Sequence, residues 1–288
     1  MGLMLSSVGA MLARMRTARD VELGTYFLRP GRVTEALLEA AKRGAHVRVA
    51  AQHDPYGGDA ADARPQANDA IARELRAAGA EVTLFERDAT PFHLKAAVCD
   101  GEAFLDDRNW TGSGKDLVLA DDDRRDVQLV GEALRGTAGA DAALALRKDE
   151  ALRREAALIE GAPHDPVLVE TETIGRGPLS HALREHAAAG AATTLIVAPA
   201  PARKRSEAET IRELRAHGVR VLTGGSDEKM ALAGDAAWIG SANGTSTYYT
   251  GKDGRPRPAG DQIEWGLVTR EPRLVDAVRA ALARDAAA

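Results

Sequence analysis

A histidine and a lysine stand two residues apart at the head of an apolar run, where His93 and Lys95 open the stretch FHLKAAVCDGEAFLDDRNW, residues 92–110. A strand over this run would hold both basic side chains on one face, because side chains alternate along a strand with a period of two. Imidazole titrates near neutral pH and suits both the nucleophile and the general-acid role in catalysis. The spacing therefore predicts two basic groups directed at one site.

The same arrangement returns in the second half of the chain. The stretch DEKMALAGDAAWIGSANG, residues 227–244, follows the first at a constant offset of 134, which pairs Lys95 with Lys229 and Asn109 with Asn243. An ungapped offset with identical lysines and asparagines indicates an internal duplication.

The elements that must position these residues repeat as well. A predicted helix and strand over residues 71–84 recur over residues 211–223, and in both halves strands alternate with helices of about 12 residues. This pattern predicts an α/β fold in which helices cover a mixed sheet. We expect two pseudo-twofold-related halves, residues 1–140 and residues 164–288, joined by a helical linker over residues 141–163.

The composition is that of an ordinary globular protein, with 44% hydrophobic residues and a formal net charge of −5. That charge gives no overall attraction to nucleic acid, and aromatic residues make up only 4% of the chain, so nucleic acid is the less favoured partner. The single cysteine, Cys99, lies in an apolar run and is expected in the core. Residues 1–18 lack the features of a signal peptide, and no segment approaches the roughly 20 apolar residues of a membrane span, so we expect a cytoplasmic protein.

Two tandem α/β halves, with His-x-Lys at the head of a strand in the first and Gly-Ser-x-Asn after a strand in the second, resemble the phospholipase D superfamily with its duplicated HKD motif. The resemblance implies that one motif histidine attacks the phosphorus of a phosphodiester to form a phosphohistidine, while the other protonates the leaving group. It also implies that the lysines and asparagines hold the phosphate oxygens, with no metal or other cofactor. Such cations and hydrogen-bond donors stabilise the transition state of an anionic substrate.

The first half keeps most of this motif. His93, Lys95, Asp100 and Asn109 fit, so the resemblance makes His93 the candidate nucleophile, Lys95 and Asn109 phosphate-binding groups, and Asp100 a supporting residue. An aspartate pair, residues 106–107, replaces the Gly-Ser of the motif. These aspartates would add negative charge near an anionic substrate.

The second half keeps the phosphate-binding part of the motif. Lys229, Ser241 and Asn243 fit, whereas the histidine position holds Asp227 and the motif aspartate position holds Gly234. One half thus retains the nucleophile and the other retains the phosphate cradle.

The missing second histidine leaves the general acid open among three candidates. Asp227 stands at the right position, although Lys229 beside it favours the ionised carboxylate, which is a poor acid. His53 follows a predicted strand, at the edge where α/β sheets usually bind ligands. A second copy of the chain could instead supply His93 across a dimer axis, so both a monomer and a homodimer are open.

Further groups are candidates for supporting the site. Tyr26, on the first predicted strand, belongs either to the core or to a pocket wall. Asp126 and Glu264 open corresponding late strands, and the resemblance implies that an acidic residue there supports the motif histidine. Glu264 would then steady the surroundings of Asp227 or cap its strand. The chain has no Cys/His cluster with ligand spacing, and we assign no metal site.

Three functions are consistent with these residues. The first is a metal-independent phosphodiesterase or phosphatidyl-type transferase that acts through His93 on a lipid or another phosphodiester. The second is a catalytically degenerate protein that binds a phosphate-containing ligand, which the missing histidine favours. The third is a nuclease, which the composition favours less. Loops over residues 52–68 and 244–262 are expected to border the site.

Overall fold

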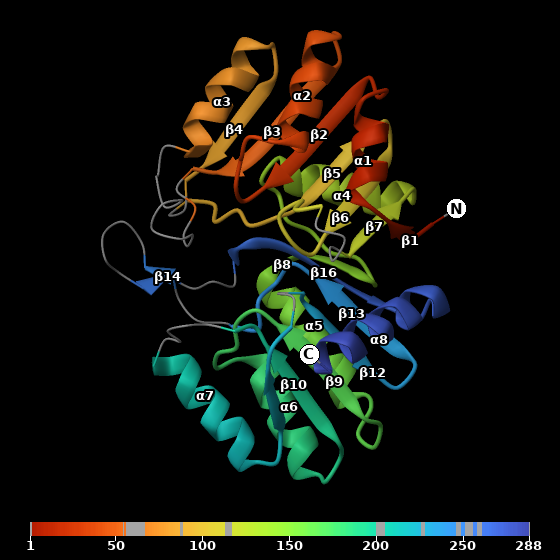
Figure 1. The fold of residues 1–288 in the computed structure, drawn as a ribbon, viewed down its shortest axis with the longest axis vertical. Helices are drawn as coiled ribbons and strands as arrows, with labels where there is room; N and C mark the ends of the chain where they lie inside the picture. The colour runs from red at the N-terminus through yellow and green to blue at the C-terminus, as the bar shows by residue number, and fades with distance from the viewer. Residues whose placement is uncertain are drawn as a thin grey trace. The chain divides into compact units, whose positions relative to one another are not determined.

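The computed structural model describes residues 2–53, 55, 67–86, 89–112, 117–199, 205–225, 228–245, 249–250, 256–257 and 261–287. The chain forms two compact units. The first is Met1–Asp141 with Gly251–Arg255 and Asp261–Glu264, and the second is Ala142–Thr250 with Pro256–Gly260 and Trp265–Ala288. Each unit contains a seven-stranded mixed sheet covered by helices (Figure 1). The predicted α/β fold class is therefore confirmed.

The sheet of the first unit has the strand order β1-β7-β6-β5-β2-β3-β4. Strands β2, β3 and β4 are parallel, and the remaining neighbours pair antiparallel. The strands are β1 (Met4–Ser6), β2 (Asp20–Thr25), β3 (His46–Gln52), β4 (Glu81–Phe85), β5 (Ala96–Cys99), β6 (Glu102–Asp106) and β7 (Val118–Asp121). The helices are α1 (Val8–Met15), α2 (Arg32–Lys42), α3 (Ala67–Ala77) and α4 (Arg124–Leu134).

Strand β2 shows how the two faces of this sheet are covered. Val21 and Leu23 point into the core built with α1, α2 and α3, whereas Gly24 faces α4 on the other side. A Cβ on Gly24 would lie 2.6 Å from the Leu134 side chain and 3.0 Å from the Phe92 ring, so α4 packs directly on this glycine. Cys99 is fully buried in the core, as expected, and burial raises the pKa of its thiol to about 12.

The second unit repeats this plan. Its sheet has the order β11-β10-β9-β12-β13-β16-β8, which read backwards matches the first sheet strand for strand. The strands are β8 (Leu144–Arg147), β9 (Val167–Thr171), β10 (Thr193–Val197), β11 (Arg220–Thr223), β12 (Met230–Ala233), β13 (Ala236–Gly240) and β16 (Ile263–Thr269). The helices are α5 (Lys148–Glu160), α6 (Pro178–Ala188), α7 (Arg205–Ala216) and α8 (Pro272–Ala286), and β14 (Tyr249–Thr250) pairs with β15 (Pro256–Arg257).

Two segments differ from the sequence-based expectation. Residues 126–131, expected as a strand, lie in α4, because Asp123 caps the helix by accepting hydrogen bonds from the backbone N–H groups of Arg125 and Asp126. Residues 141–163, expected to link the halves, contain β8 and α5. The inner face of α5 is buried in the core of the second unit.

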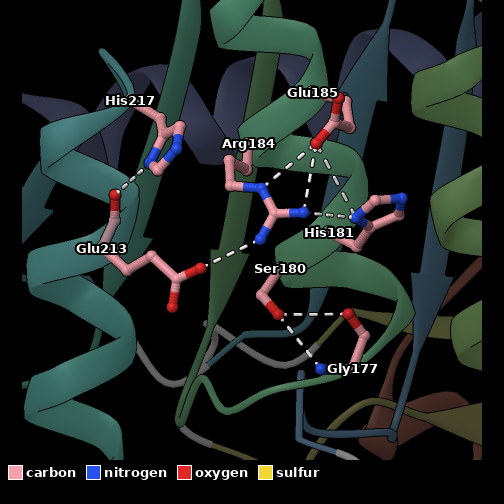
Figure 2. Close-up of polar contacts among 7 residues, drawn as sticks. All are labelled: Gly177, Ser180, His181, Arg184, Glu185, Glu213 and His217. Carbon is pink, nitrogen blue, oxygen red and sulfur yellow. Dashed lines mark hydrogen bonds and ion pairs between the residues drawn. The ribbon is translucent and has the colours of Figure 1, made fainter.

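Helices α6 and α7 are joined by polar contacts (Figure 2). Arg184 of α6 donates to Glu213 of α7 at 2.9 Å and to its own neighbour Glu185 at 3.1 Å, and its Nη2 lies 2.7 Å from Nδ1 of His181. His217 contacts the Glu213 carbonyl. These histidines therefore take part in helix contacts. Among the described residues, no helix is both long and apolar enough to cross a membrane.

Candidate active site

His93 and Lys95 lie immediately before β5, because pairing with β2 begins at Ala96. The predicted strand is therefore shorter at its start than expected, and the His93 N–H donates instead to the Ile263 carbonyl at 2.9 Å. The two basic side chains nevertheless lie together. Lys95 Nζ is 2.7 Å from Nδ1 and 2.9 Å from Nε2 of His93. Lys95 is buried, and the His93 side chain keeps 15% of its surface exposed.

Glu264 also contacts the imidazole of His93. Its Oε1 lies 3.3 Å from Nδ1 of His93, and its side chain is only 1% exposed. Glu264 shares Nδ1 with the closer ammonium group of Lys95, and a buried carboxylate at this position stabilises an imidazolium. The structure thus places Glu264 against His93 of the first motif, whereas its expected role beside Asp227 concerns a residue outside the described ones.

Asp126 was expected to correspond to Glu264, and this is wrong. Pairing of Asp106 with Val118 matches pairing of Gly240 with Gly266, so the counterpart of Glu264 is residue 116, outside the described residues. Asp126 lies in the first turn of α4 instead. Burial and hydrogen bonds with Asp141 and Asp121 raise its pKa to about 8.

Tyr26, the first residue after β2, packs edge-on against His93. The ring centroids are 4.5 Å apart, and Lys95 Nζ lies 5.9 Å from the Tyr26 centroid. Tyr26 is 7% exposed. It is therefore both a core residue and a wall of the His93 site.

A buried amide network that the sequence did not reveal anchors this segment. The side chain of Gln52, at the end of β3, accepts a hydrogen bond from the Phe92 N–H at 2.9 Å. Asn68 donates to the Gln52 carbonyl at 2.6 Å and to the Tyr26 carbonyl at 3.0 Å. Both amides are buried. The network thus fixes the backbone on either side of the His93 and Tyr26 contact, and the only sequence signal was a glutamine ending a buried strand.

The side chain of Asp100 supports the backbone of a turn. It lies in the turn between β5 and β6 with a φ of 47° and accepts hydrogen bonds from the N–H groups of Arg19 and Asp20, both at 2.9 Å. The bond from Asp20 is the main reason that the pKa of Asp100 is lowered. At the matching turn, Gly234 has no side chain, and a Cβ there would lie 2.8 Å from Asp165.

The aspartate pair that replaces Gly-Ser also supports the backbone. Asp106 accepts a hydrogen bond from the Trp110 N–H at 2.6 Å, and Asp107 accepts one from the Leu117 N–H at 3.0 Å. Ser241 in the second half does the same for the Trp265 N–H at 3.1 Å. These three side chains are fully buried. Asp107 and Ser241 thus have equivalent structural roles, and the expectation of a phosphate contact at Ser241 has no support in this geometry.

The remaining first-half candidates, Asn109 and His53, have other described surroundings. Asn109 lines a pocket of about 420 Å³ to which His93, Lys95 and Glu264 do not contribute. His53 has Nδ1 2.6 Å from Glu86 and Nε2 3.4 Å from Asp69, so both ring nitrogens face carboxylates.

In the second half, a carboxylate faces the motif lysine. Glu172 lies 3.6 Å from Nζ of the buried Lys229 and accepts a hydrogen bond from the Asn243 amide at 3.1 Å. Glu172 is the first residue after β9, just as Tyr26 is the first after β2. The sequence reading missed it, although aligning the two strand ends would have revealed it. Asp227 lies outside the described residues.

One group of described carboxylates could hold a metal ion. Ligand atoms of Glu170, Glu228 and Asp285, all buried, lie within 4.8 Å of one another. Arg284 contacts both Glu228 and Asp285, at 3.3 Å and 3.1 Å. Glu228 lies in the second motif stretch, next to Lys229, but none of the three carboxylates is a predicted site residue.

Comparisons with known proteins concern the family and the fold of the chain. Residues 11–117 match the family model described as cardiolipin synthase, PLD-like domain. No curated relative matches the sequence.

Solved structures share the fold of the whole chain at low identity. Phosphatidylserine synthase from Haemophilus influenzae is 11% identical with a TM-score of 0.65, over 97% of this chain and 85% of that one. Polyphosphate kinase from Porphyromonas gingivalis is 16% identical with a TM-score of 0.65, over 98% of this chain but only 46% of the kinase. Yeast tyrosyl-DNA phosphodiesterase is 13% identical with a TM-score of 0.50, over 94% of this chain and 90% of that one. Residues 11–117 thus resemble a PLD-like domain of the phospholipase D superfamily, and both halves of the chain share the fold of these solved structures.

Proposed function

We propose that the protein cleaves or transfers a phosphodiester through a covalent intermediate on His93. One observation carries the proposal: the imidazole of His93 contacts both the buried carboxylate of Glu264 and the ammonium group of Lys95. A reacting imidazole that is oriented by a buried carboxylate is an arrangement suited to nucleophilic catalysis.

In the proposed reaction, Nε2 of His93 attacks the phosphorus. The Nε2–P bond forms while the bond from phosphorus to the leaving oxygen breaks, and the developing imidazolium is stabilised by Glu264. The Lys95 ammonium group exchanges its contact with Nε2 for one with a phosphate oxygen. Water or an alcohol then displaces His93 from the phosphorus, which releases a phosphomonoester or a new phosphodiester.

The comparisons support the reaction class but not the substrate. A phosphatidylserine synthase, a polyphosphate kinase and a tyrosyl-DNA phosphodiesterase all share this fold, and their names refer to a phospholipid, a polyphosphate and a DNA adduct. We therefore propose a phosphodiester, lipid or other, as the substrate class. A nucleic-acid substrate stays as the less favoured alternative, because the chain has a net charge of −5.

The test is hydrolysis of bis(p-nitrophenyl) phosphate, with and without a chelator. The p-nitrophenolate group leaves without protonation, so the assay does not depend on the unassigned general acid. We expect wild-type turnover that survives the chelator and is lost in His93→Ala. Glu264→Gln should lower kcat by about 10²-fold or more and shift the acidic limb of the pH profile.

His181→Ala is the matched control, since His181 is an exposed histidine that contacts Arg184 and Glu185. It should retain wild-type activity. Equal turnover by wild type and His93→Ala would contradict the proposal.

A degenerate binding protein is the second candidate, and the Glu172 contact favours it. A carboxylate against Lys229 and Asn243 occupies the groups that the resemblance assigns to phosphate. Complete absence of turnover, together with saturable binding of inorganic phosphate that is weakened in His93→Ala, would establish this function.

A further inference from the structure

A pocket of about 420 Å³ lies in the first unit, outside the His93 site. Its walls come from residues 27–34, which connect β2 to the first turn of α2, and from residues 109–112, which follow β6. Leu23 and Thr25 of β2 and Val8 of α1 also line it. The motif asparagine, Asn109, belongs to this wall. None of the residues that line this pocket takes part in the proposed reaction on His93.

The charge of the pocket suits an anion. Arg29 and Arg32 both line it, and none of the described residues that line it is acidic, in a chain whose net charge is −5. Glu35, in the first turn of α2, does not line it. Gly31 provides no side chain to cap α2, so the first N–H groups of this 11-residue helix add partial positive charge at the same place.

The rest of the lining is apolar or aromatic. Arg29 lies over the Phe27 ring with Cζ 4.7 Å from the centroid, and Trp110 is fixed by a hydrogen bond from Nε1 to the Gly24 carbonyl at 3.1 Å. Both aromatic residues line the pocket. An anionic group carried on an apolar body would therefore match it better than a free ion.

Two successive ring contacts connect the pocket to His93, the candidate nucleophile. Phe27 packs edge-on against Tyr26 at 4.7 Å, and Tyr26 packs against His93 at 4.5 Å. These residues all belong to the first unit. We infer, resting on the proposed function, that this pocket binds a second anionic group of the substrate, so that the preferred phosphodiester carries a terminal phosphate or carboxylate on one ester group.

Two p-nitrophenyl phosphodiesters test this inference, one with a 3-phosphopropyl ester group and one with a 3-hydroxypropyl ester group. Arg29→Ser/Arg32→Ser should raise KM for the phosphopropyl ester by about tenfold, which is the loss of one charge-assisted hydrogen bond. KM for the hydroxypropyl ester should stay within about twofold. Arg29→Lys/Arg32→Lys should keep most of the discrimination, and Arg273→Ser, an exposed arginine of α8, should change neither value.

A binding measurement separates failure of the pocket from failure of the proposed reaction. Phenyl phosphate is titrated into His93→Ala by calorimetry, with and without the Arg29→Ser/Arg32→Ser pair. A loss of affinity of about tenfold supports the pocket even if no variant turns over substrate. Unchanged affinity in the arginine variant, or equal KM changes for both esters, would overturn it.

Discussion

At the scale of single residues, the two motifs of this chain have diverged in opposite directions. In the first, Tyr26 presents an aromatic ring to His93 and Lys95. In the second, Glu172 at the matching strand end presents a carboxylate to Lys229 and Asn243. The same strand-end position thus carries an aromatic ring beside Lys95 and a carboxylate beside Lys229.

Replacing Glu172 by glutamine should restore an anion-binding second motif. The substitution keeps the hydrogen bond to Asn243 within reach but removes the negative charge beside Lys229. We expect inorganic phosphate to bind several-fold more tightly, because an opposite charge at this distance is worth about 1 kcal/mol or more at a partly exposed site. Isothermal titration of wild type and Glu172→Gln measures this. Glu185→Gln, on the surface of α6, is the control, and an unchanged affinity would argue against a masking role for Glu172.

The aspartates also show that the residue type at a motif position does not establish the function of that residue. Asp106 and Asp107 looked like negative charges aimed at a substrate, yet each accepts a backbone N–H and is fully buried. Asp107 and Ser241 satisfy equivalent backbone groups with different side chains. Different side chains at such a position can accept the same backbone N–H group, so the charge of the side chain does not indicate the charge of the substrate.

At the scale of elements, α4 contains the clearest pH-sensitive group. The raised pKa of Asp126 means that the folded chain keeps its proton up to about pH 8, whereas an unfolded aspartate loses it near pH 4. The folded state therefore binds more protons between these values, and stability must fall as pH rises through this window. Above about pH 8 the protonated Asp126 no longer contributes to the stability of the folded state.

Asp126→Asn should remove this pH dependence. An amide imitates the protonated carboxyl toward Asp121 and Asp141 without a proton to lose. Thermal unfolding from pH 5 to pH 9 should show a smaller decline of Tm in the variant than in wild type. Asp276→Asn, on the exposed side of α8, should follow the wild-type curve. If the Tm of Asp126→Asn falls with pH as steeply as the Tm of wild type, other titrating groups dominate the pH dependence of stability.

Element by element, the sequence pattern was most reliable where burial is periodic. The helix and the strand predicted over residues 211–223 appear as α7 and β11, respectively. The pattern misled at residues 126–131, since a short apolar run reads equally well as a strand or as one face of a helix. The Asp123 cap and contacts of α4 with the sheet resolved that ambiguity.

At the scale of the whole molecule, β16 belongs to both units. Ile263 and Glu264 group with the first unit, and Trp265 onward with the second. The catalytic candidate His93 therefore depends on a strand whose remainder is held in the second sheet, where Gly240 pairs with Gly266. Packing in the second unit should thus influence chemistry in the first.

Gly240→Ala tests this dependence. A Cβ there would lie 2.6 Å from the Trp265 carbonyl oxygen and 2.7 Å from the Trp238 ring, so β16 must shift next to Glu264. We expect a loss of about 1–3 kcal/mol in unfolding free energy from overpacking, and a fall in activity beyond that caused by a core substitution elsewhere. Urea unfolding and the bis(p-nitrophenyl) phosphate assay measure the two effects. The matched control is Gly139→Ala, whose Cβ would meet only the Leu129 side chain, at 2.9 Å. Full activity in a destabilised Gly240→Ala protein would refute the coupling.

The sequence alone predicted the duplication, the α/β class and the motif residues His93, Lys95 and Lys229, because identical residues at a constant spacing and periodic apolar runs are local signals. It did not determine which groups surround them. Glu264 reaches His93, Gln52 and Asn68 anchor the segment, and Glu172 faces Lys229 only because strands distant in sequence pair in a particular register. Side-chain neighbours across such strands depend on the packing of the whole sheet, and only the tertiary structure decided them.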